Sequence, residues 1–485
     1  MESSRQSQAL RVLFFAETWE RFSFYGMRAL LIIYMTSQLR YSDDHAYQIY
    51  GAYAALVYST PLIGGMLSDK VLGAQRAVVL GGVLMALGHF ALAFESLFFW
   101  GIAFLICGNG FFKPNISTIV GRVYPDKDAR RDRAFYIFYM GINLGALVAG
   151  VCGWLGQKVA WHLGFGLAGV GMLIGLAGFL LGRRAYEGAA DPPDPVKLRQ
   201  PLLGGLTREH LVYLGAFAAV AVAFVLVQAG SWLGKGLAVV GVATLIGLAW
   251  FVVFRASRAE RGPLVVAIVL TLFSAVFFAF FEQAGSSMTL FTERNVDRVV
   301  LGVDIPASVF ASLNPLYVLL CAPLFIWLWR KLGPKEPTTP LKFGLGVIQL
   351  GLGFGAMWLG ASSARETGVV PLVWLMLGIL LHTTGELCVS PVGLSMITKL
   401  APGRIVGVMM GVWFLASAEA HYVAAWIAQL TNVQGAEDGG EALAAPATVM
   451  VYGSVFGGIA LTALVTGALM CAVSPLLSRR MGDVR

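Results

Sequence analysis

Three ionisable side chains lie close together in the first strongly apolar segment of the chain. Glu17, Glu20 and Arg21 are followed by Tyr25 and Arg28. On an α-helix Glu17, Arg21 and Arg28 would lie within about 40° of one another, with Tyr25 about 40° further round. Charges at membrane depth cost several kcal/mol each unless they are paired or hydrated, so this cluster is expected to face a wet cavity. The spacing therefore predicts a membrane protein that handles protons and charged solutes.

The composition is that of a polytopic helical membrane protein. Of the 485 residues, 57% are hydrophobic and 13% are charged, and the mean hydropathy is +0.73. Soluble domains carry about 25% charged residues. The apolar runs last about 20 residues, as membrane helices do, whereas β-barrel strands alternate over about 10. The polar start and the lack of a small-residue cleavage site after the first segment predict an uncleaved first helix.

We expect fourteen membrane helices, an even number that places both termini on one side. The Pro- and Asp-rich stretch at 183–207 is expected to be an exposed, non-helical linker after the sixth helix. The predicted organisation is an N-terminal six-helix bundle at 1–182, a linker with two additional helices at 183–265, and a C-terminal six-helix bundle at 266–485. The predicted segments are 10–36, 46–67, 76–96, 99–121, 133–153, 160–182, 208–228, 234–255, 266–291, 306–330, 341–361, 370–397, 404–430 and 448–476.

The basic residues predict the orientation. Of the 35 lysines and arginines, Arg21, Arg28 and Lys113 lie inside predicted segments, and few lie in loops on one side of the membrane. The rest lie with the termini on the other side, which predicts cytoplasmic termini. The net charge of +8 is therefore topogenic and does not indicate nucleic-acid binding. Five carboxylates fall inside the predicted segments: Glu17, Glu20, Glu282, Glu386 and Glu419.

Several motifs resemble known transporter signatures. The loop from Gly65 to Arg76 reads G-x-L-S-D-x-x-x-G-x-x-R, which resembles the signature loop of the major facilitator superfamily. Further motifs, in order over nearly the whole chain, resemble the proton-dependent oligopeptide transporter family. They are Glu17–Phe22 with Tyr25 and Gly26, Phe112–Asn115, Phe138–Gly145, Glu282–Ser286, Ser312–Pro315, and Gly385–Leu387 with Ser390 and Pro391.

The resemblance implies an all-α major facilitator fold of two six-helix bundles plus two extra helices. It also implies a secondary active transporter and not an enzyme: a proton-coupled symporter of di- and tripeptides, working by alternating access. The expected location is the bacterial inner membrane, in contact with the lipid bilayer. No cofactor other than the coupling proton and no metal are expected, and the monomer is expected to function.

A peptide is a zwitterion with variable side chains, so a promiscuous site should clamp the two termini and leave roomy pockets between them. The N-terminal half has the cations Arg21 and Lys113, and the C-terminal half has the carboxylates Glu282 and Glu386. A zwitterion bridging them would draw the two bundles together.

The resemblance also assigns individual roles. Cationic and hydroxyl groups hold the peptide carboxylate, amides and a carboxylate hold its ammonium, and aromatic rings line side-chain pockets. The alternatives are helix packing for the aromatic rings, interhelical hydrogen bonds for the amides and structural ion pairs for the charged residues. The residues are Arg21, Tyr25 and Lys113 for the carboxylate; Asn143, Asn314 and Glu386 for the ammonium; and Tyr58 and Trp413 for the pockets. Ser390 is expected to bind substrate as well.

Proton coupling requires a carboxylate whose ionisation depends on its partner. Glu17 and Glu20 beside Arg21 meet this requirement, because Arg21 turning to a substrate carboxylate would favour protonation. Two acids so close titrate as one coupled unit. By resemblance, Glu282 joins the coupling group and pairs with Arg28 in a periplasmic gate. Lys113 and Glu386 form a second pair that substrate or proton can break.

The nearest rival function is transport of another solute, since plant relatives carry nitrate and other small anions. The presence of both Lys113 and Glu386 favours a zwitterion, because a simple anion gives Glu386 nothing to bind. An intramembrane enzyme is disfavoured, since the chain has no H-E-x-x-H or G-x-S-x-G motif. The sequence assigns no role to His382, Glu419, His421 or the helices within 208–255.

Overall fold

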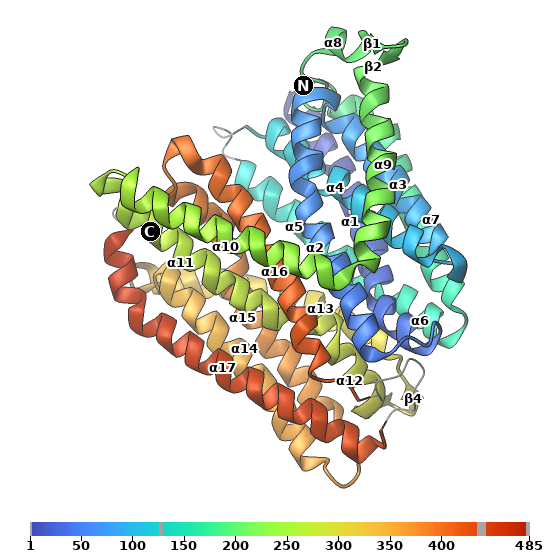
Figure 1. The fold of residues 1–485 in the computed structure, drawn as a ribbon, viewed down its shortest axis with the longest axis vertical. Coiled ribbons are helices and arrows are strands. Elements are labelled where there is room, and N and C mark those ends of the chain that lie inside the picture. Colours follow the sequence, from blue (N-terminus) through green and yellow to red (C-terminus); the bar gives the residue numbers. More distant parts are fainter. Residues whose placement is uncertain (1, 126–127, 129, 434–442, 482–485) are drawn as a thin grey trace. The chain divides into compact units, whose positions relative to one another are not determined.

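The computed structural model describes the whole chain except residues 1, 126–127, 129, 434–442 and 482–485. Most of the described chain is α-helical (Figure 1). It divides into two compact units. Unit 1 comprises Met1–Tyr34, Ala52–Gly230 and Ser308–Ser312, and unit 2 comprises Met35–Gly51, Ser231–Ala307 and Leu313–Arg485.

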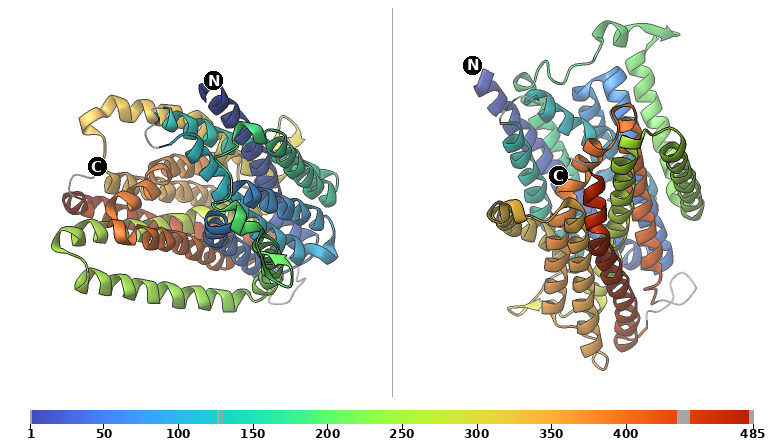
Figure 2. Two further views of the ribbon diagram at one scale, coloured as in Figure 1. Left: turned by 90° about the horizontal axis from the view of Figure 1, so that it is seen from above. Right: turned by 90° about the vertical axis from the view of Figure 1, so that its left-hand side faces the viewer.

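Unit 1 contains the first nine α-helices of the chain. A short β-hairpin precedes the last of them (Figure 2). The elements are α1 (Glu2–Ser37) as far as Tyr34, α2 (Asp43–Leu67) from Ala52, the π-helical turn Ser68–Leu72, α3 (Ala74–Ala91), a 3₁₀ turn at Glu95–Leu97, α4 (Phe98–Val123), α5 (Arg131–Val148), α6 (Gly150–Lys158), α7 (Trp161–Leu181), a 3₁₀ turn at Arg183–Ala185, α8 (Pro195–Arg199), β1 (Pro201–Leu203), β2 (Leu206–Thr207) and α9 (Arg208–Gln228).

Glycines let the helices of unit 1 approach closely. A Cβ atom on Gly81 of α3 would lie 2.6 Å from the carbonyl oxygen of Gly108 on α4, and a Cβ on Gly108 would lie 2.7 Å from the carbonyl of Gly81. Small residues at such crossings favour helix association in membranes. Helix α9 packs along α4, where Trp100 stacks on Phe224 with ring centroids 4.3 Å apart (Figure 1).

Unit 2 contains the remaining helices and a two-stranded hairpin. The elements are α10 (Gly230–Phe254), α11 (Arg258–Phe281), a 3₁₀ turn at Glu282–Gly285, α12 (Ser287–Asn295), β3 (Val299–Val300), β4 (Val303–Asp304), the start of a 3₁₀ helix at Ala307–Ser312, α13 (Leu313–Leu332), a 3₁₀ turn at Gly333–Lys335, α14 (Thr339–Ser363), α15 (Leu372–Leu400), a 3₁₀ turn at Gly403–Ile405, α16 (Val406–Gln429) and α17 (Ala445–Arg480).

Glycines also let α14 pack closely against α17 along much of their length (Figure 1). A Cβ atom on Gly467 of α17 would lie 2.9 Å from the carbonyl oxygen of Gly344 on α14. By contrast, only 22% of the apolar stretch of α9 and 11% of that of α10 are buried within the protein. These two helices therefore have largely uncovered apolar surfaces, as expected of helices that face lipid.

Among the described residues, twelve helical spans are long and apolar enough to cross a membrane by length and composition. They correspond to the last twelve of the predicted segments. The first two predicted segments correspond to α1, which has 36 residues, and α2, which has 25. Helix α1 is less apolar because it carries Glu17, Glu20, Arg21 and Arg28. The residues expected to carry function thus weaken the hydropathy signal of their own helix.

Two local expectations were wrong. The linker at 183–207 is not free of helix, because Pro195 begins α8 and the Asp194 side chain accepts a hydrogen bond of 3.0 Å from the Lys197 amide. Proline is tolerated at the first helical position, where its missing N–H would have no partner in the helix. The helix predicted at 266–291 is not continuous, since a 3₁₀ turn at Glu282–Gly285 separates α11 from α12.

Candidate substrate and proton sites

The first ion cluster lies in the middle of α1, within unit 1. The Nε atom of Arg21 lies 2.5 Å from Oε2 of Glu20 and 3.2 Å from Oε1 of Glu17. The Nη2 atom of Arg21 donates a hydrogen bond of 2.9 Å to Oε1 of Glu20. Each of the three side chains is at most 3% exposed. When both carboxylates are ionised, two negative charges share one guanidinium, so the cluster can accept a further positive charge.

Helix α5 passes directly behind this cluster because two glycines of the Phe138–Gly145 motif allow the approach. A Cβ atom on Gly145 would lie 2.2 Å from the carbonyl oxygen of Thr18 and 2.9 Å from Cβ of Arg21. A Cβ atom on Gly141 would lie 3.0 Å from Oγ1 of Thr18. Larger residues at these positions would force α5 away from α1. The four-residue spacing of Gly141 and Gly145 predicts a close helix contact of this kind, and the structure identifies α1 as the partner helix.

Lys113 of α4 brings a second cation to the cluster. Its Nζ atom lies 4.7 Å from the centroid of the Tyr58 ring on α2, within the range of a cation–π interaction. Lys113 also interacts electrostatically with both Glu17 and Glu20. The structure thus brings together five of the predicted site residues: Glu17, Glu20, Arg21, Tyr58 and Lys113.

Tyr25 and Asn143 are the other predicted substrate residues of unit 1. Tyr25 is half-buried, and its ring meets that of Phe24 edge to face at 5.4 Å. Asn143 is buried, and its Nδ2 atom donates a hydrogen bond of 3.1 Å to the carbonyl of Tyr139 in its own helix. That bond lies within α5 and is not the interhelical bond that the packing alternative predicts.

Asn314 and Glu386 meet in unit 2. The Nδ2 atom of Asn314 on α13 donates hydrogen bonds of 3.0 Å to Oε2 of Glu386 and 3.1 Å to Oγ1 of Thr383, both on α15. The amide therefore orients the carboxylate that the resemblance assigns to a peptide ammonium. The same bond is also an interhelical bond of the kind that stabilises membrane helix pairs.

Glu282 has a partner that the sequence did not predict. It lies in the 3₁₀ turn after α11, and its Oε1 atom is 3.3 Å from Nε2 of His421 on α16. The Nδ1 atom of His421 lies 2.7 Å from the carbonyl oxygen of Ser417. No motif links these positions. The available signal was that a buried carboxylate needs a partner, and His421 is one of two histidines in the C-terminal predicted segments.

The remaining predicted residues of unit 2 lie on α15 and α16. Ser390 and Trp413 are half-buried. A Cβ atom on Gly393 would lie 2.5 Å from the Trp413 ring, so the indole packs against α15. His382 is buried, and its ring centroid lies 4.5 Å from that of Phe354 on α14. Glu419 faces α10, where a Cβ atom on Gly241 would lie 1.9 Å from its Oε1.

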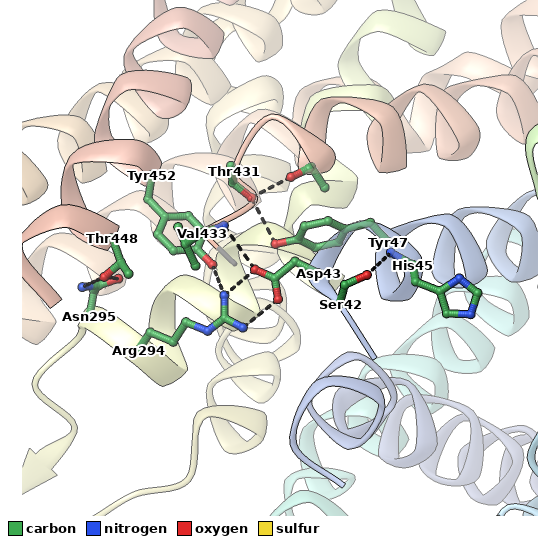
Figure 3. Close-up of polar contacts among 11 residues, drawn as sticks. Ser42, Asp43, His45, Tyr47, Arg294, Asn295, Thr431, Val433, Thr448 and Tyr452 are labelled. Atoms are coloured by element: carbon green, nitrogen blue, oxygen red, sulfur yellow. Dashed lines mark hydrogen bonds and ion pairs between the residues drawn. The ribbon is translucent and has the colours of Figure 1, made fainter. Parts of the chain in front are cut away.

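A second buried charge pair, which the sequence missed, lies elsewhere in unit 2 (Figure 3). The guanidinium of Arg294 binds Asp43 in a bidentate manner, with Nη1 2.6 Å from Oδ2 and Nη2 2.7 Å from Oδ1. Asp43 is 0% exposed and the Arg294 side chain is 17% exposed. Asp43 precedes the predicted segment 46–67 and Arg294 follows the predicted segment 266–291, and polar residues at segment ends are usually solvated.

Hydrogen bonds surround this pair on several sides (Figure 3). The Nη1 atom of Arg294 also donates to the Tyr452 hydroxyl at 3.1 Å, and the amide of Val433 donates to Oδ2 of Asp43 at 3.5 Å. Nearby, the hydroxyls of Tyr47 and Thr431 are 3.0 Å apart. Residues from four distant parts of the sequence thus enclose one ion pair, which ties the segment Met35–Gly51 to unit 2.

The two predicted gate pairs join residues of different units. Arg28 and Lys113 belong to unit 1, whereas Glu282 and Glu386 belong to unit 2. The Arg28–Glu282 and Lys113–Glu386 pairs therefore stay predictions. Among the described residues, no group of three or more His, Cys, Asp or Glu side chains could hold a metal ion.

Known proteins resemble this chain over nearly its full length. The profile of the POT family matches residues 75–448. The peptide transporter YePEPT of Yersinia enterocolitica subsp. palearctica serotype O:3 (strain YE-P4) is 38% identical over 84% of this chain and 84% of its own length. Dipeptide and tripeptide permease A of Proteus mirabilis (strain HI4320) is 34% identical over 99% of this chain and 96% of its own.

Solved structures agree with the sequence relatives. A crystal structure of a POT peptide transporter in complex with alafosfalin covers 98% of this chain and 96% of its own, with a TM-score of 0.83 and 36% identity. This chain belongs to the POT family. It is therefore a polytopic helical membrane protein with the major facilitator fold and a secondary transporter, as its motifs predicted, and not an enzyme.

Proposed function

We propose that this protein imports di- and tripeptides together with protons. The observation that carries the proposal is the buried cluster on α1, in which Arg21 is shared by Glu17 and Glu20. A guanidinium held by two carboxylates can exchange one of them for the carboxylate of a substrate without leaving the cluster. The printed names of the relatives from Yersinia and Proteus, a peptide transporter and a dipeptide and tripeptide permease, support the same substrate class.

In this proposal, opposite ends of the peptide bind opposite charges. Arg21, Lys113 and Tyr25 bind the peptide carboxylate, and Tyr58 positions Lys113 through its ring. Glu386, oriented by Asn314, binds the peptide ammonium. The assignment places cations in unit 1 and carboxylates in unit 2. Alternating access between the two bundles is part of this proposal.

The remaining predicted substrate residues have buried or half-buried side chains. We assign Asn143, together with Asn314 and Glu386, to the peptide ammonium, and Ser390 to the substrate site. The rings of Tyr58 and Trp413 are assigned to side-chain pockets. Arg28 with Glu282, and Lys113 with Glu386, act as gate pairs that substrate or proton breaks.

Proton coupling uses the same α1 cluster. When Arg21 turns to the substrate carboxylate, Glu17 and Glu20 lose part of their neutralising charge. A proton then binds to the pair, which titrates as one coupled unit. Glu282 belongs to the coupling group through its contact with His421, since both groups can hold a proton. Substrate and proton thereby enter together.

We propose fourteen membrane helices, with α1 and α2 added to the twelve apolar spans. The three-part division is retained in functional terms: transporting bundles at 1–182 and 266–485, and an accessory linker and helix pair at 183–265. The distribution of Lys and Arg supports cytoplasmic termini in the bacterial inner membrane. The monomer is proposed to function, because the assigned residues all belong to one chain.

The test is dialanine uptake into proteoliposomes under an inward proton gradient. We expect uptake that collapses with a protonophore. Glu17→Gln and Glu20→Gln should each abolish gradient-driven uptake while sparing counterflow exchange, because exchange of substrate for substrate moves no net proton. Loss of both activities in a variant shown to be folded would contradict the proton assignment. Folded protein that carries no di- or tripeptide would contradict the substrate class.

A further inference from the structure

A cavity of about 540 Å³ lies in unit 1, and none of the predicted substrate residues lines it. One wall comes from the first turns of α1 and the other from the end of α4 and the start of α5. The lining residues are Ser7, Leu10, Arg11 and Phe14 on the α1 side, and Tyr124, Arg130, Arg133, Ala134 and Ile137 on the other. None of them belongs to the proposed peptide site.

The floor of the cavity is apolar. Leu10, Tyr124 and Ala134 form a buried cluster, and Val123 and Ile137 pack against it. Leu10, Tyr124 and Ala134 are 9%, 4% and 2% exposed, respectively. A small inorganic anion would make no use of such a floor, since it has no apolar surface to bury.

The rim of the cavity carries three guanidinium groups. Arg130 is held in place, because its Nη2 and Nε atoms lie 2.8 and 3.0 Å from the two carboxylate oxygens of Asp128. Hydrogen bonds from the Arg130 side chain hold the pKa of the Asp128 carboxyl below its usual value, so this acid stays ionised and neutralises Arg130. Arg11 and Arg133 are exposed, and no carboxylate among the described residues pairs with either.

Two uncompensated arginines above an apolar floor fit a ligand that combines a phosphodiester with hydrocarbon. Guanidinium groups bind phosphate oxygens through paired hydrogen bonds. Basic pockets between membrane helices on the cytoplasmic side recognise anionic lipid headgroups. We propose that this cavity binds the headgroup and proximal acyl chain of an anionic phospholipid. The lipid would bridge α1, which carries the ion cluster, and α5, which lies behind it.

The experiment is native mass spectrometry of the full-length protein in detergent, titrated with dioleoylphosphatidylglycerol or the neutral dioleoylphosphatidylcholine. Wild-type protein should retain one phosphatidylglycerol and prefer it to phosphatidylcholine by about tenfold. The double variant Arg11→Gln/Arg133→Gln should bind phosphatidylglycerol about tenfold more weakly. The matched control Arg199→Gln/Arg258→Gln removes the same charge from exposed positions outside the cavity and should bind like wild type.

A third variant separates the headgroup from the hydrocarbon. Ile137→Trp fills the floor while keeping all three arginines, so it should weaken phosphatidylglycerol binding as well. Inorganic phosphate should not displace the lipid at equal concentration. Equal loss in the control variant, equal binding of phosphatidylcholine, or displacement by phosphate would each overturn the proposal. Melting temperatures identify any variant that fails to fold. If the double arginine variant does not fold, the binding of phosphatidylglycerol to Ile137→Trp tests the proposal without removing charge. Peptide uptake is not part of this test, so the lipid proposal can be supported or contradicted independently of the proposed function.

Discussion

The Glu17–Glu20–Arg21 cluster of unit 1 and the Asp43–Arg294 pair of unit 2 are both buried, but their charges are matched to different degrees. Arg294 meets one carboxylate in a bidentate pair, and a tyrosine hydroxyl and a backbone amide complete the bonding. In the α1 cluster, Oε2 of Glu17, Oε2 of Glu20 and Nε of Arg21 lack a hydrogen bond of suitable angle within the described chain, although the ions are in contact.

The difference indicates what each site does. A bidentate pair with its surroundings satisfied has little to gain from a new partner, so it suits a fixed structural contact. In the α1 cluster, carboxylate and guanidinium atoms without a hydrogen bond of suitable angle can exchange partners or take up a proton, as the proposed proton coupling requires. Under the proposed function, the unmatched polar atoms of the α1 cluster, rather than burial alone, distinguish it from the Asp43–Arg294 pair.

Alanine at each arginine gives the largest expected contrast. Arg294→Ala leaves Asp43 buried without its cation, which should lower the free energy of unfolding by about 3–5 kcal/mol. Arg21→Ala should destabilise the protein less, because Glu17 and Glu20 can share a proton, as paired acids do. It should nevertheless abolish dialanine uptake. Thermal unfolding in detergent and uptake per folded molecule measure the two effects. A larger stability loss for Arg21→Ala would reverse the comparison.

Replacing Arg294 or Arg21 by lysine should change the free energy of unfolding less than alanine does, and it tests the geometry of each site rather than its charge. Lysine cannot reproduce the fork of Arg294, so Arg294→Lys should lose one charged hydrogen bond, about 1.5–3 kcal/mol. Arg21 also contacts both oxygens of Glu20, but Lys113 lies beside the cluster as a second cation, so Arg21→Lys should lose no more than about 1.5 kcal/mol. Chemical denaturation of the two purified variants decides the matter. Equal losses would mean that the α1 cluster depends on fork geometry as strongly as the Asp43 pair does.

Local spacing was enough to predict the core of the α1 cluster but not the pair around Asp43. Residues at positions i and i+4 of a helix face each other whatever the rest of the fold does, so Glu17 and Arg21 could be placed together from the sequence. Glu20 is the direct neighbour of Arg21, and its contact depends on side-chain conformation, which spacing does not predict. Asp43 and Arg294 are 251 residues apart, and their contact depends on how the start of α2 packs in unit 2. No periodicity encodes such a contact.

The same limit applies to the other findings that the sequence missed. The contact between Glu282 and His421 joins the 3₁₀ turn after α11 to α16, and no sequence motif links these two positions. The α-helix ends at Phe281 and continues as a 3₁₀ turn whose C-cap is Ser286, where φ is −129° and ψ is −99°, and apolar periodicity carries no information about this break. The spacing of Gly141 and Gly145 predicted a close helix contact, but the identity of the partner helix, α1, became visible only in three dimensions.

Gly145→Ala tests whether that approach supports the α1 cluster. The added Cβ would lie 2.2 Å from a backbone oxygen of α1, which cannot rotate away as a side chain can. Helix α5 must therefore shift, at a cost of about 1–3 kcal/mol, and Arg21 and Asn143 would move apart, lowering dialanine uptake. Gly166→Ala on α7 is the matched control, because nothing lies within 4 Å of its added Cβ. If Gly145→Ala and Gly166→Ala have the same melting temperature and the same dialanine uptake, the ion cluster keeps its geometry without support from α5. The incomplete hydrogen bonding of the cluster would then be a property of α1 alone.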